Sequence, residues 1–376
     1  MIGLRCARLF DGDVLHRGPA TVVIEDDRIA DAAGEVPVVD LGDVTLMPGL
    51  VDAHSHLVFE PGSDIPRDMA ETSREVLLER MRRHALQALR AGITTVRDLG
   101  DRDYLAVELR DTLGSDGPEI LAAGPPITTP GGHCWFLGGE TPPDRLAEAV
   151  AERAARGVDV IKVMATGGGI TPGSLAHQSQ YDLDQLRTVV EAAHAADLPV
   201  TAHAHAGTGI RDAVRAGVDG IEHCTFMTGH GADPDWSVVA EIVDAGVHVG
   251  VTAARMPTGN ALPPHVIAAR AHVARIQRAG ARVVCCSDAG VIPDKPHDCL
   301  PHSLPEFQEL TQLPAAAVLT SVTRLAAESC GLGHRKGRIA AGYDADLLAV
   351  HGDPTEDLTA LLDVVAVFRA GARVDD

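Results

Sequence analysis

The feature that most constrains this chain is a short apolar segment that ends in two histidines one residue apart, PGLVDAHSHL at residues 48–57. Side chains on a strand alternate between its two faces, so His54 and His56 point the same way. Two imidazoles at the carboxyl end of one buried strand could hold one metal ion between them. The alternative is a pair of histidines that only form local hydrogen bonds.

Beyond this segment the sequence alternates between helical periodicity and short apolar segments. Helices are expected at 71–91, 104–113, 144–156, 183–196, 210–216, 237–245, 266–279, 304–310 and 315–330. Eight strands are expected, one in the opening segment and the others at 93–99, 119–123, 158–165, 199–205, 218–224, 247–252 and 282–288. This alternation predicts an α/β fold, a (β/α)8 TIM barrel over residues 48–333.

The two ends of the chain are rich in short β segments. They include 4–9, 20–25 and 36–41 near the start, and 336–350 and 364–374 near the end. Either end alone has too few strands to be stable. We therefore expect residues 1–47 and 334–376 to pair into one small β-sandwich domain.

Composition narrows the partners and the compartment. The formal net charge of −21 disfavours nucleic acid and anionic membranes as partners. The start of the chain lacks the apolar core of a signal peptide, and no run of about 18 apolar residues occurs. The seven cysteines have no C-x-x-C spacing and are expected to be reduced, which predicts a cytoplasmic protein. The sequence leaves open whether the protein is a homo-oligomer.

Catalytic groups in such a barrel lie at the carboxyl ends of the strands. The side chains there that could bind a metal or do chemistry are His54, His56, Lys162, His203, His205, His223 and Asp288. Two of them have a plain structural alternative, since His223 could be a hydrogen-bonded core histidine and Asp288 could cap the following turn. The set as a whole predicts a metal site.

Lys162 is the most informative member of the set. It shares a strand face with Val160 and Met164, which points it into the barrel, where an ammonium would be strongly desolvated. It could pair with a carboxylate, or it could be a low-pKa amine that forms a Schiff base. It could also react with carbon dioxide to give a carbamate, an anionic ligand that bridges two metals. The surrounding histidines favour the carbamate.

At this point the chain resembles the amidohydrolase superfamily, in the branch similar to imidazolonepropionase and the prolidase-like Xaa-Pro and Xaa-Arg dipeptidases. The motifs that carry the resemblance are PGLVDAHSHL (48–57), TTVRDLG (94–100), VIKVMATGGG (160–169), VTAHAHA (200–206), GVDGIEHC (217–224), CSDAG (286–290) and GRIAAGYDADLLAV (337–350). The resemblance implies two divalent metals, with zinc the first expectation. His54, His56 and Asp288 would bind one, His203 and His223 the other, and carboxylated Lys162 would bridge them.

The resemblance also implies roles in catalysis. The two cations would lower the pKa of a bridging water, and Asp288 would accept its proton and pass it to the leaving amine. His133, in the glycine-rich loop 124–139, is placed to donate to the substrate carbonyl, and the alternative is a loop histidine in solvent. In that family the first histidine of a strand-5 pair is the usual ligand, which leaves His205 among the substrate-binding residues. The other substrate-binding candidates are His133, Trp135, His177, Gln178 and Tyr181.

The sequence therefore predicts a metal-dependent hydrolase of an amide-type C–N bond in a peptide or N-acyl amino acid. The main alternative is a urea, carbamate or cyclic amide substrate, because neither glycine-rich loop, 124–139 or 166–180, contains an Arg or Lys for a dipeptide carboxylate. Two further alternatives are a Schiff-base lyase that uses Lys162 and a metal-free binding or scaffold protein.

Overall fold

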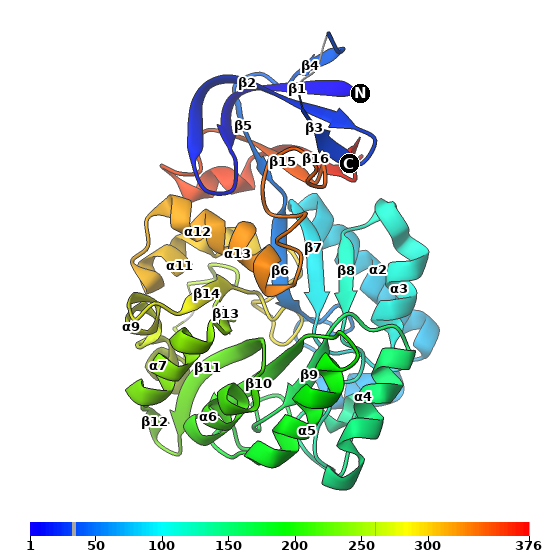
Figure 1. Ribbon diagram of the computed structural model, residues 1–376, viewed down its shortest axis with the longest axis vertical. Helices are drawn as coiled ribbons and strands as arrows, with labels where there is room; N and C mark the ends of the chain where they lie inside the picture. The colour runs from blue at the N-terminus through cyan, green and yellow to red at the C-terminus, as the bar shows by residue number, and fades with distance from the viewer. Residues whose placement is uncertain (32–34, 260, 376) are drawn as a thin grey trace.

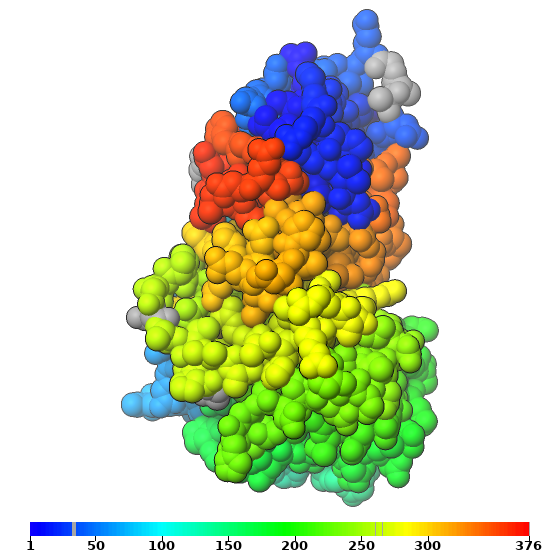
Figure 2. Space-filling model, turned by 90° about the vertical axis from the view of Figure 1, so that its left-hand side faces the viewer, coloured from blue at the N-terminus to red at the C-terminus, as the bar shows by residue number. Residues whose placement is uncertain are grey.

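The computed structural model describes residues 1–31, 35–259 and 261–375 of the chain. A sheet built from both chain ends lies at one end of the molecule, and alternating helices and strands form the rest (Figure 1). In the space-filling view the N-terminal and C-terminal segments lie against each other at that end (Figure 2). None of the described helices is long and apolar enough to cross a membrane.

The eight predicted parallel strands are all present, but they form two sheets. The first contains β6 (Leu50–Ser55), β7 (Ile93–Asp98) and β8 (Glu119–Ala122). The second contains β9 (Ile161–Met164), β10 (Val200–Ala206), β11 (Gly220–Thr228), β13 (His248–Val251) and β14 (Arg282–Cys285), and the two-residue β12 (Gly231–Ala232) pairs with β11. The mixed α/β class expected from the sequence is therefore confirmed.

The expected barrel is not closed as one hydrogen-bonded sheet among the described residues. Only isolated bridges join the two sheets, Ser55 to Ala289 on one side and Ile127 to Val163 on the other. The ladder is interrupted after β8 because Pro125 and Pro126 have no backbone N–H to donate. After β14 it is interrupted because the backbone N–H of Ser287 donates to the Asp52 carboxylate, 3.1 Å away, instead of to a strand carbonyl.

The helices follow the predicted order with some differences in their bounds. They are α1 (Ile65–Glu71), α2 (Arg74–Arg90), α3 (Leu105–Leu113), α4 (Leu146–Ala155), α5 (Leu183–His194), α6 (Gly207–Ala216), α7 (Trp236–Ala245), α8 (Pro264–Arg270), α9 (Val273–Arg278), α10 (Cys299–His302), α11 (Leu304–Thr311), α12 (Ala315–Ser321) and α13 (Arg324–Ser329). The helix predicted at 71–91 begins only at Arg74 because the Ser73 side chain caps it. The helices predicted at 266–279 and 315–330 are each two shorter helices.

The strands of the two chain ends form one sheet in the order β17-β16-β15-β5-β1-β2-β3, with β4 beside β1. They are β1 (Ile2–Phe10), β2 (Leu15–Glu25), β3 (Arg28–Ala30), β4 (Val38–Asp40), β5 (Val44–Pro48), β15 (Leu347–His351), β16 (Val364–Arg369) and β17 (Ala372–Arg373). The strand predicted from 336 begins only at Leu347. The preceding side chains of Lys336 and Asp344 are instead held in a buried ion cluster with Glu119.

Candidate active site

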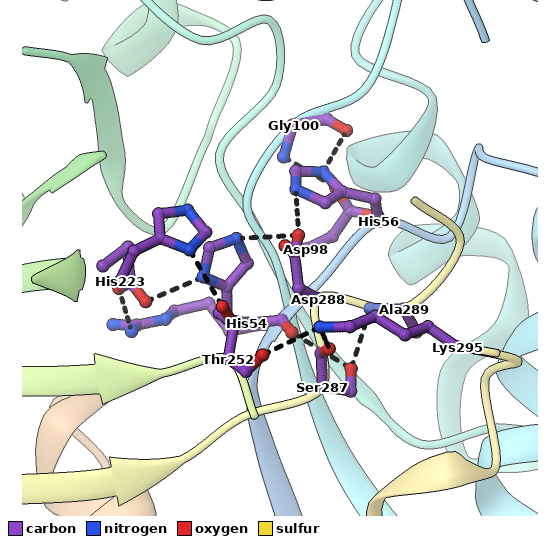
Figure 3. A network of polar contacts seen from close by, with 12 residues as sticks. His54, His56, Asp98, Gly100, His223, Thr252, Ser287, Asp288, Ala289 and Lys295 are labelled. Atoms are coloured by element: carbon purple, nitrogen blue, oxygen red, sulfur yellow. Dashed lines mark hydrogen bonds and ion pairs between the residues drawn. The ribbon is translucent and has the colours of Figure 1, made fainter. Parts of the chain in front are cut away.

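Side chains from opposite edges of the two sheets meet at the carboxyl ends of the strands. His54 and His56 leave β6 toward Asp288, which follows β14 (Figure 3). Their Nε2 atoms lie 3.5 and 3.4 Å from the same Asp288 oxygen. Asp288 has a positive φ of 55°, a rare conformation for a residue other than glycine, and such strain is often found at functional sites.

A second group of imidazoles continues the first. The ring centroids of His203, His205 and His223 lie 4.5 to 4.6 Å from one another. His223 is also 5.1 Å from His54, so the five histidines form one continuous cluster. All five, together with Lys162 and Asp288, line a cavity of about 620 Å³. The structure thus brings together every strand-end residue that the sequence singled out.

Each of these imidazoles is held through one ring nitrogen, which leaves the opposite nitrogen for a ligand. The Nδ1 atoms of His54 and His56 donate to Glu222 (2.8 Å) and to the Gly100 carbonyl (3.1 Å), and Nε2 of His203 donates to the Gly167 carbonyl (3.0 Å). The Nδ1 atoms of His205 and His223 are hydrogen-bonded to the hydroxyls of Thr225 (2.8 Å) and Thr252 (2.9 Å). Supported imidazoles of this kind are typical of metal ligands.

Glu222 is the buried carboxylate behind His54. It also accepts hydrogen bonds from Arg97 at 3.0 Å and from Thr201 at 2.7 Å. A Cβ atom on Gly250 would lie 2.2 Å from its Oε2, so the glycine makes room for it. Burial alone would raise the pKa of Glu222, but His54 and Arg97 outweigh it and hold the pKa well below its usual range.

Lys162 lies among these groups with a side chain that is 1% exposed. Its Nζ has no hydrogen-bond partner in the described part of the chain, so the alternative of a hydrogen-bonded carboxylate pair is not found there. Burial lowers the pKa of Lys162. A buried amine without a hydrogen-bond partner, in a cavity that five imidazoles and a carboxylate also line, fits a carbamate that binds metal better than it fits an ammonium.

Burial also sets the protonation of the surrounding groups. It lowers the pKa of His54 to about 4 and places the pKa values of His203 and His223 well below the usual range. These rings are neutral near pH 7, as metal ligands must be. Burial by itself would raise the pKa of Asp288, but the interactions with His54, with the hydrogen-bonding His56 and with Lys295 outweigh it and hold the pKa well below its usual range.

His133 reaches the cavity from the loop after β8. Its ring is 4% exposed and lies 4.6 Å from the ring of His203. A Cβ on Gly168 would fall 2.4 Å from Nε2, so this glycine makes room for the ring. The His133 backbone N–H donates to Gln180 Oε1 at 2.5 Å, a positioning contact that the sequence did not reveal.

Four other predicted substrate-binding residues do not line this cavity. Trp135 is 44% exposed, and His177 and Gln178 are also exposed. Tyr181 is buried, and its hydroxyl donates to the Thr141 carbonyl at 2.8 Å, which is a packing role.

The cavity has cationic residues that the sequence analysis missed. Arg255, Arg270 and Lys295 line it, and all three follow β13 or β14. Arg270 is 2.9 Å and Arg255 3.7 Å from Glu306. The signal that could have found them is their position, since the segments after these two strands lie at the same end of the sheet as the ligands.

The family model described as "Amidohydrolase family" matches residues 45–374. This chain belongs to the amidohydrolase family. The ochratoxinase of Aspergillus niger is 25% identical over 95% of this chain and 82% of its own length. The imidazolonepropionase of Salinispora tropica is 25% identical over 89% of this chain and 86% of its own. A solved Xaa-Pro dipeptidase with bound methionine in the active site matches all of both chains at 27% identity, with a TM-score of 0.85.

The family assignment agrees with the superfamily resemblance noted in the sequence. This amidohydrolase is an enzyme, a hydrolase that acts on C–N bonds. The family is metal-dependent, and the described residues contain two groups at the cavity whose ligand atoms lie within 4.8 Å of one another. These groups are His203, His205 and His223, and His54, His223 and Asp288.

Proposed function

We propose that this amidohydrolase is a binuclear metal enzyme that cleaves the amide bond of a peptide or N-acyl amino acid. His54, His56 and Asp288 would hold one metal, His203 and His223 the other, and carboxylated Lys162 would lie between them. The observation that carries the proposal is the buried Lys162 Nζ, which has no hydrogen-bond partner among the described residues. Zinc suits this set of ligands best.

Two bound metals would supply Lewis acidity and a water of lowered pKa. The residues of the chain would do the rest. Asp288, ionised and at the cavity, would take up the proton of the attacking water and deliver it to the leaving nitrogen. His133 would donate a hydrogen bond to the substrate carbonyl oxygen, where negative charge develops.

The rest of the cavity supports a substrate with an apolar group and a carboxylate. Much of the wall is apolar, including Met164, Met227 and Val273. Arg255 and Arg270 supply the cations that the two glycine-rich loops lack. The related Xaa-Pro dipeptidase has the amino acid methionine bound in its active site, which also supports a substrate with a carboxylate. A urea, carbamate or cyclic amide remains the alternative substrate class.

The arrangement of the chain is part of the proposal. The eight parallel strands of residues 48–333 would act as one (β/α)8 barrel that supports the site. Residues 1–47 and 334–376 would form the small β domain as a sandwich. A cytoplasmic location is proposed because all seven cysteines are buried and free.

The first test is the metal content of protein purified with bicarbonate and without chelator. The chain has only three lysines, Lys162, Lys295 and Lys336, and all are buried. Labelling with ¹³C-bicarbonate should therefore give one carbamate resonance that is lost in Lys162→Met, where the metal content falls below the two expected per chain. Absence of bound metal after reconstitution would refute the proposal.

A panel of substrates distinguishes between the proposed substrate class and the alternative one. N-acyl amino acids and dipeptides should be hydrolysed in preference to ureas, carbamates and cyclic amides. Preference for any of the latter three would establish the alternative. Borohydride trapping of a carbonyl substrate on Lys162 would establish the Schiff-base lyase instead.

A further inference from the structure

We propose that His205 is a metal ligand, so that His203, His205 and His223 form a three-histidine position that holds a metal without Lys162. The inference rests on the proposed function only in that metal is bound at this cavity. It differs from the family pattern, in which the first histidine of the pair suffices.

The three rings are already gathered as ligands of one ion would be. Each offers a nitrogen, and these nitrogens lie within 4.8 Å of one another. Three nitrogens at about 2.1 Å around a tetrahedral zinc are roughly 3.4 Å apart, so small rotations of the rings would complete the site. The ring of His205 stacks on that of His223 with the centroids 4.5 Å apart and the planes at 21°, and both residues line the cavity.

An irregularity of β11 brings His205 and its support together. Ala204 of β10 pairs with His223, but Ala206 pairs with Met227, so β11 has a bulge of two extra residues. His223, Cys224 and Phe226 have φ values of 71°, 51° and 51°, a strained backbone of the kind that clusters at functional sites. The bulge contains Thr225, whose hydroxyl is hydrogen-bonded to His205.

The hydrogen bond that holds the His205 ring resembles the one that holds His223, which is proposed above as a metal ligand. Its Nδ1 is bonded to a threonine hydroxyl from β11, as the Nδ1 of His223 is bonded to Thr252 after β13. Nε2 of His205 is therefore left for a ligand.

The test compares metal binding in Lys162→Met, His205→Gln and the double variant, using zinc alone and a competing chromophoric chelator. Wild type should bind two zinc ions per chain, Lys162→Met should keep the zinc at the three-histidine position, and the double variant should lose that zinc. His205→Gln should weaken the binding of zinc at the three-histidine position at least tenfold. X-ray absorption of the Lys162→Met protein with one zinc should show three imidazoles.

His133→Gln is the matched control, because His133 lines the same cavity and lies 4.6 Å from His203 without belonging to the three-histidine group. It should bind zinc as wild type does. Circular dichroism establishes that each variant is folded. If His205→Gln binds both zinc ions as tightly as wild type, or Lys162→Met loses both, the inference is overturned while the proposed function stands. A wild type that binds no metal would overturn both.

Discussion

Lys162 lines the same cavity as the five strand-end histidines, and its burial bears on the chemistry of the site. An ammonium fully removed from water costs several kcal/mol unless it is paired and hydrogen-bonded, yet Lys162 Nζ has no such partner among the described residues. A carbamate changes the group from a cation to an anion that neutral imidazoles and metals can surround. The buried position is therefore consistent with a modified lysine.

Glu222→Gln tests whether the hydrogen bond between His54 and Glu222 contributes to metal binding. The amide keeps the size of the side chain but loses the negative charge that His54 and Arg97 share. Metal affinity measured by chelator competition should fall about 10- to 100-fold, the usual effect of losing such a support. Glu241→Gln, which alters an exposed pair with Arg215, is the control and should bind metal normally. Unchanged affinity in Glu222→Gln would contradict this role.

His133→Asn tests the proposed carbonyl contact. Burial lowers the pKa of His133 to about 3, so the ring is a neutral donor across the working pH range. Its loss should reduce kcat by roughly 10² to 10³, as for other donors to a developing oxyanion, with the metal content unchanged. The shape of the pH profile should also be unchanged, because this ring does not titrate between pH 5 and 8. A rise in KM alone would show that His133 only binds substrate.

At the scale of elements, the short strands leave room for the site by placing glycine where neighbours crowd. Gly250 of β13 lies against the Glu222 carboxylate, and Gly168 follows β9 against the ring of His133. A strand of β-branched residues alone would have stronger β propensity, but it would block these side chains. Glycine therefore lowers the β propensity of these segments at the positions where the side chains of the site need space.

Gly250→Ala measures how much the protein depends on the space that Gly250 leaves for the Glu222 carboxylate. The added Cβ would lie 2.2 Å from Glu222 Oε2, and overpacking of this kind costs about 1 to 3 kcal/mol. Chemical denaturation of the metal-free variant should show this loss, together with weaker metal binding. Gly229→Ala is the control, since no heavy atom lies within 4 Å of its added Cβ. Equal stability of the two variants would show that β11 moves aside.

At the scale of the whole molecule, one buried ion cluster joins the sheet of the chain ends to the rest. Glu119 at the start of β8 pairs with Arg335 and Lys336, and Lys336 also reaches Asp344 and Asp346. Burial alone would raise the pKa of Glu119, but the hydrogen bond from Arg335 and the charge of Lys336 lower it to about 2.

This shift predicts acid sensitivity. A carboxyl whose folded pKa is depressed stabilises the protein fully above its unfolded value, 4.5, and loses that contribution as the pH falls toward about 2. Glu119→Gln should lower the unfolding free energy near pH 7 by up to about 3 kcal/mol, and the difference from wild type should shrink below pH 4.5. Glu148→Gln, in an exposed pair with Arg145, should stay within about 0.5 kcal/mol. A constant difference at all pH values would contradict the assignment.

The sequence by itself determined the strands, their order and the residues at their ends. Alternation along a strand and the position of its end are local properties, so His54, His56, Lys162, His203, His205, His223 and Asp288 could be named without coordinates. Helix bounds were less accurate, because single capping side chains such as Ser73 set them. Trp135 and Tyr181, which were predicted to bind substrate because of their positions in loops, do not line the cavity.

Only the tertiary structure decided which residues support the site. His54 and Glu222 are 168 residues apart in sequence, and nothing in either segment indicates the other. The pairing of His205 with Thr225 depends on a bulge between β10 and β11, and the two-sheet arrangement depends on Pro125, Pro126 and the Asp52–Ser287 contact. Such relations arise from the register between strands, which a periodic pattern does not encode.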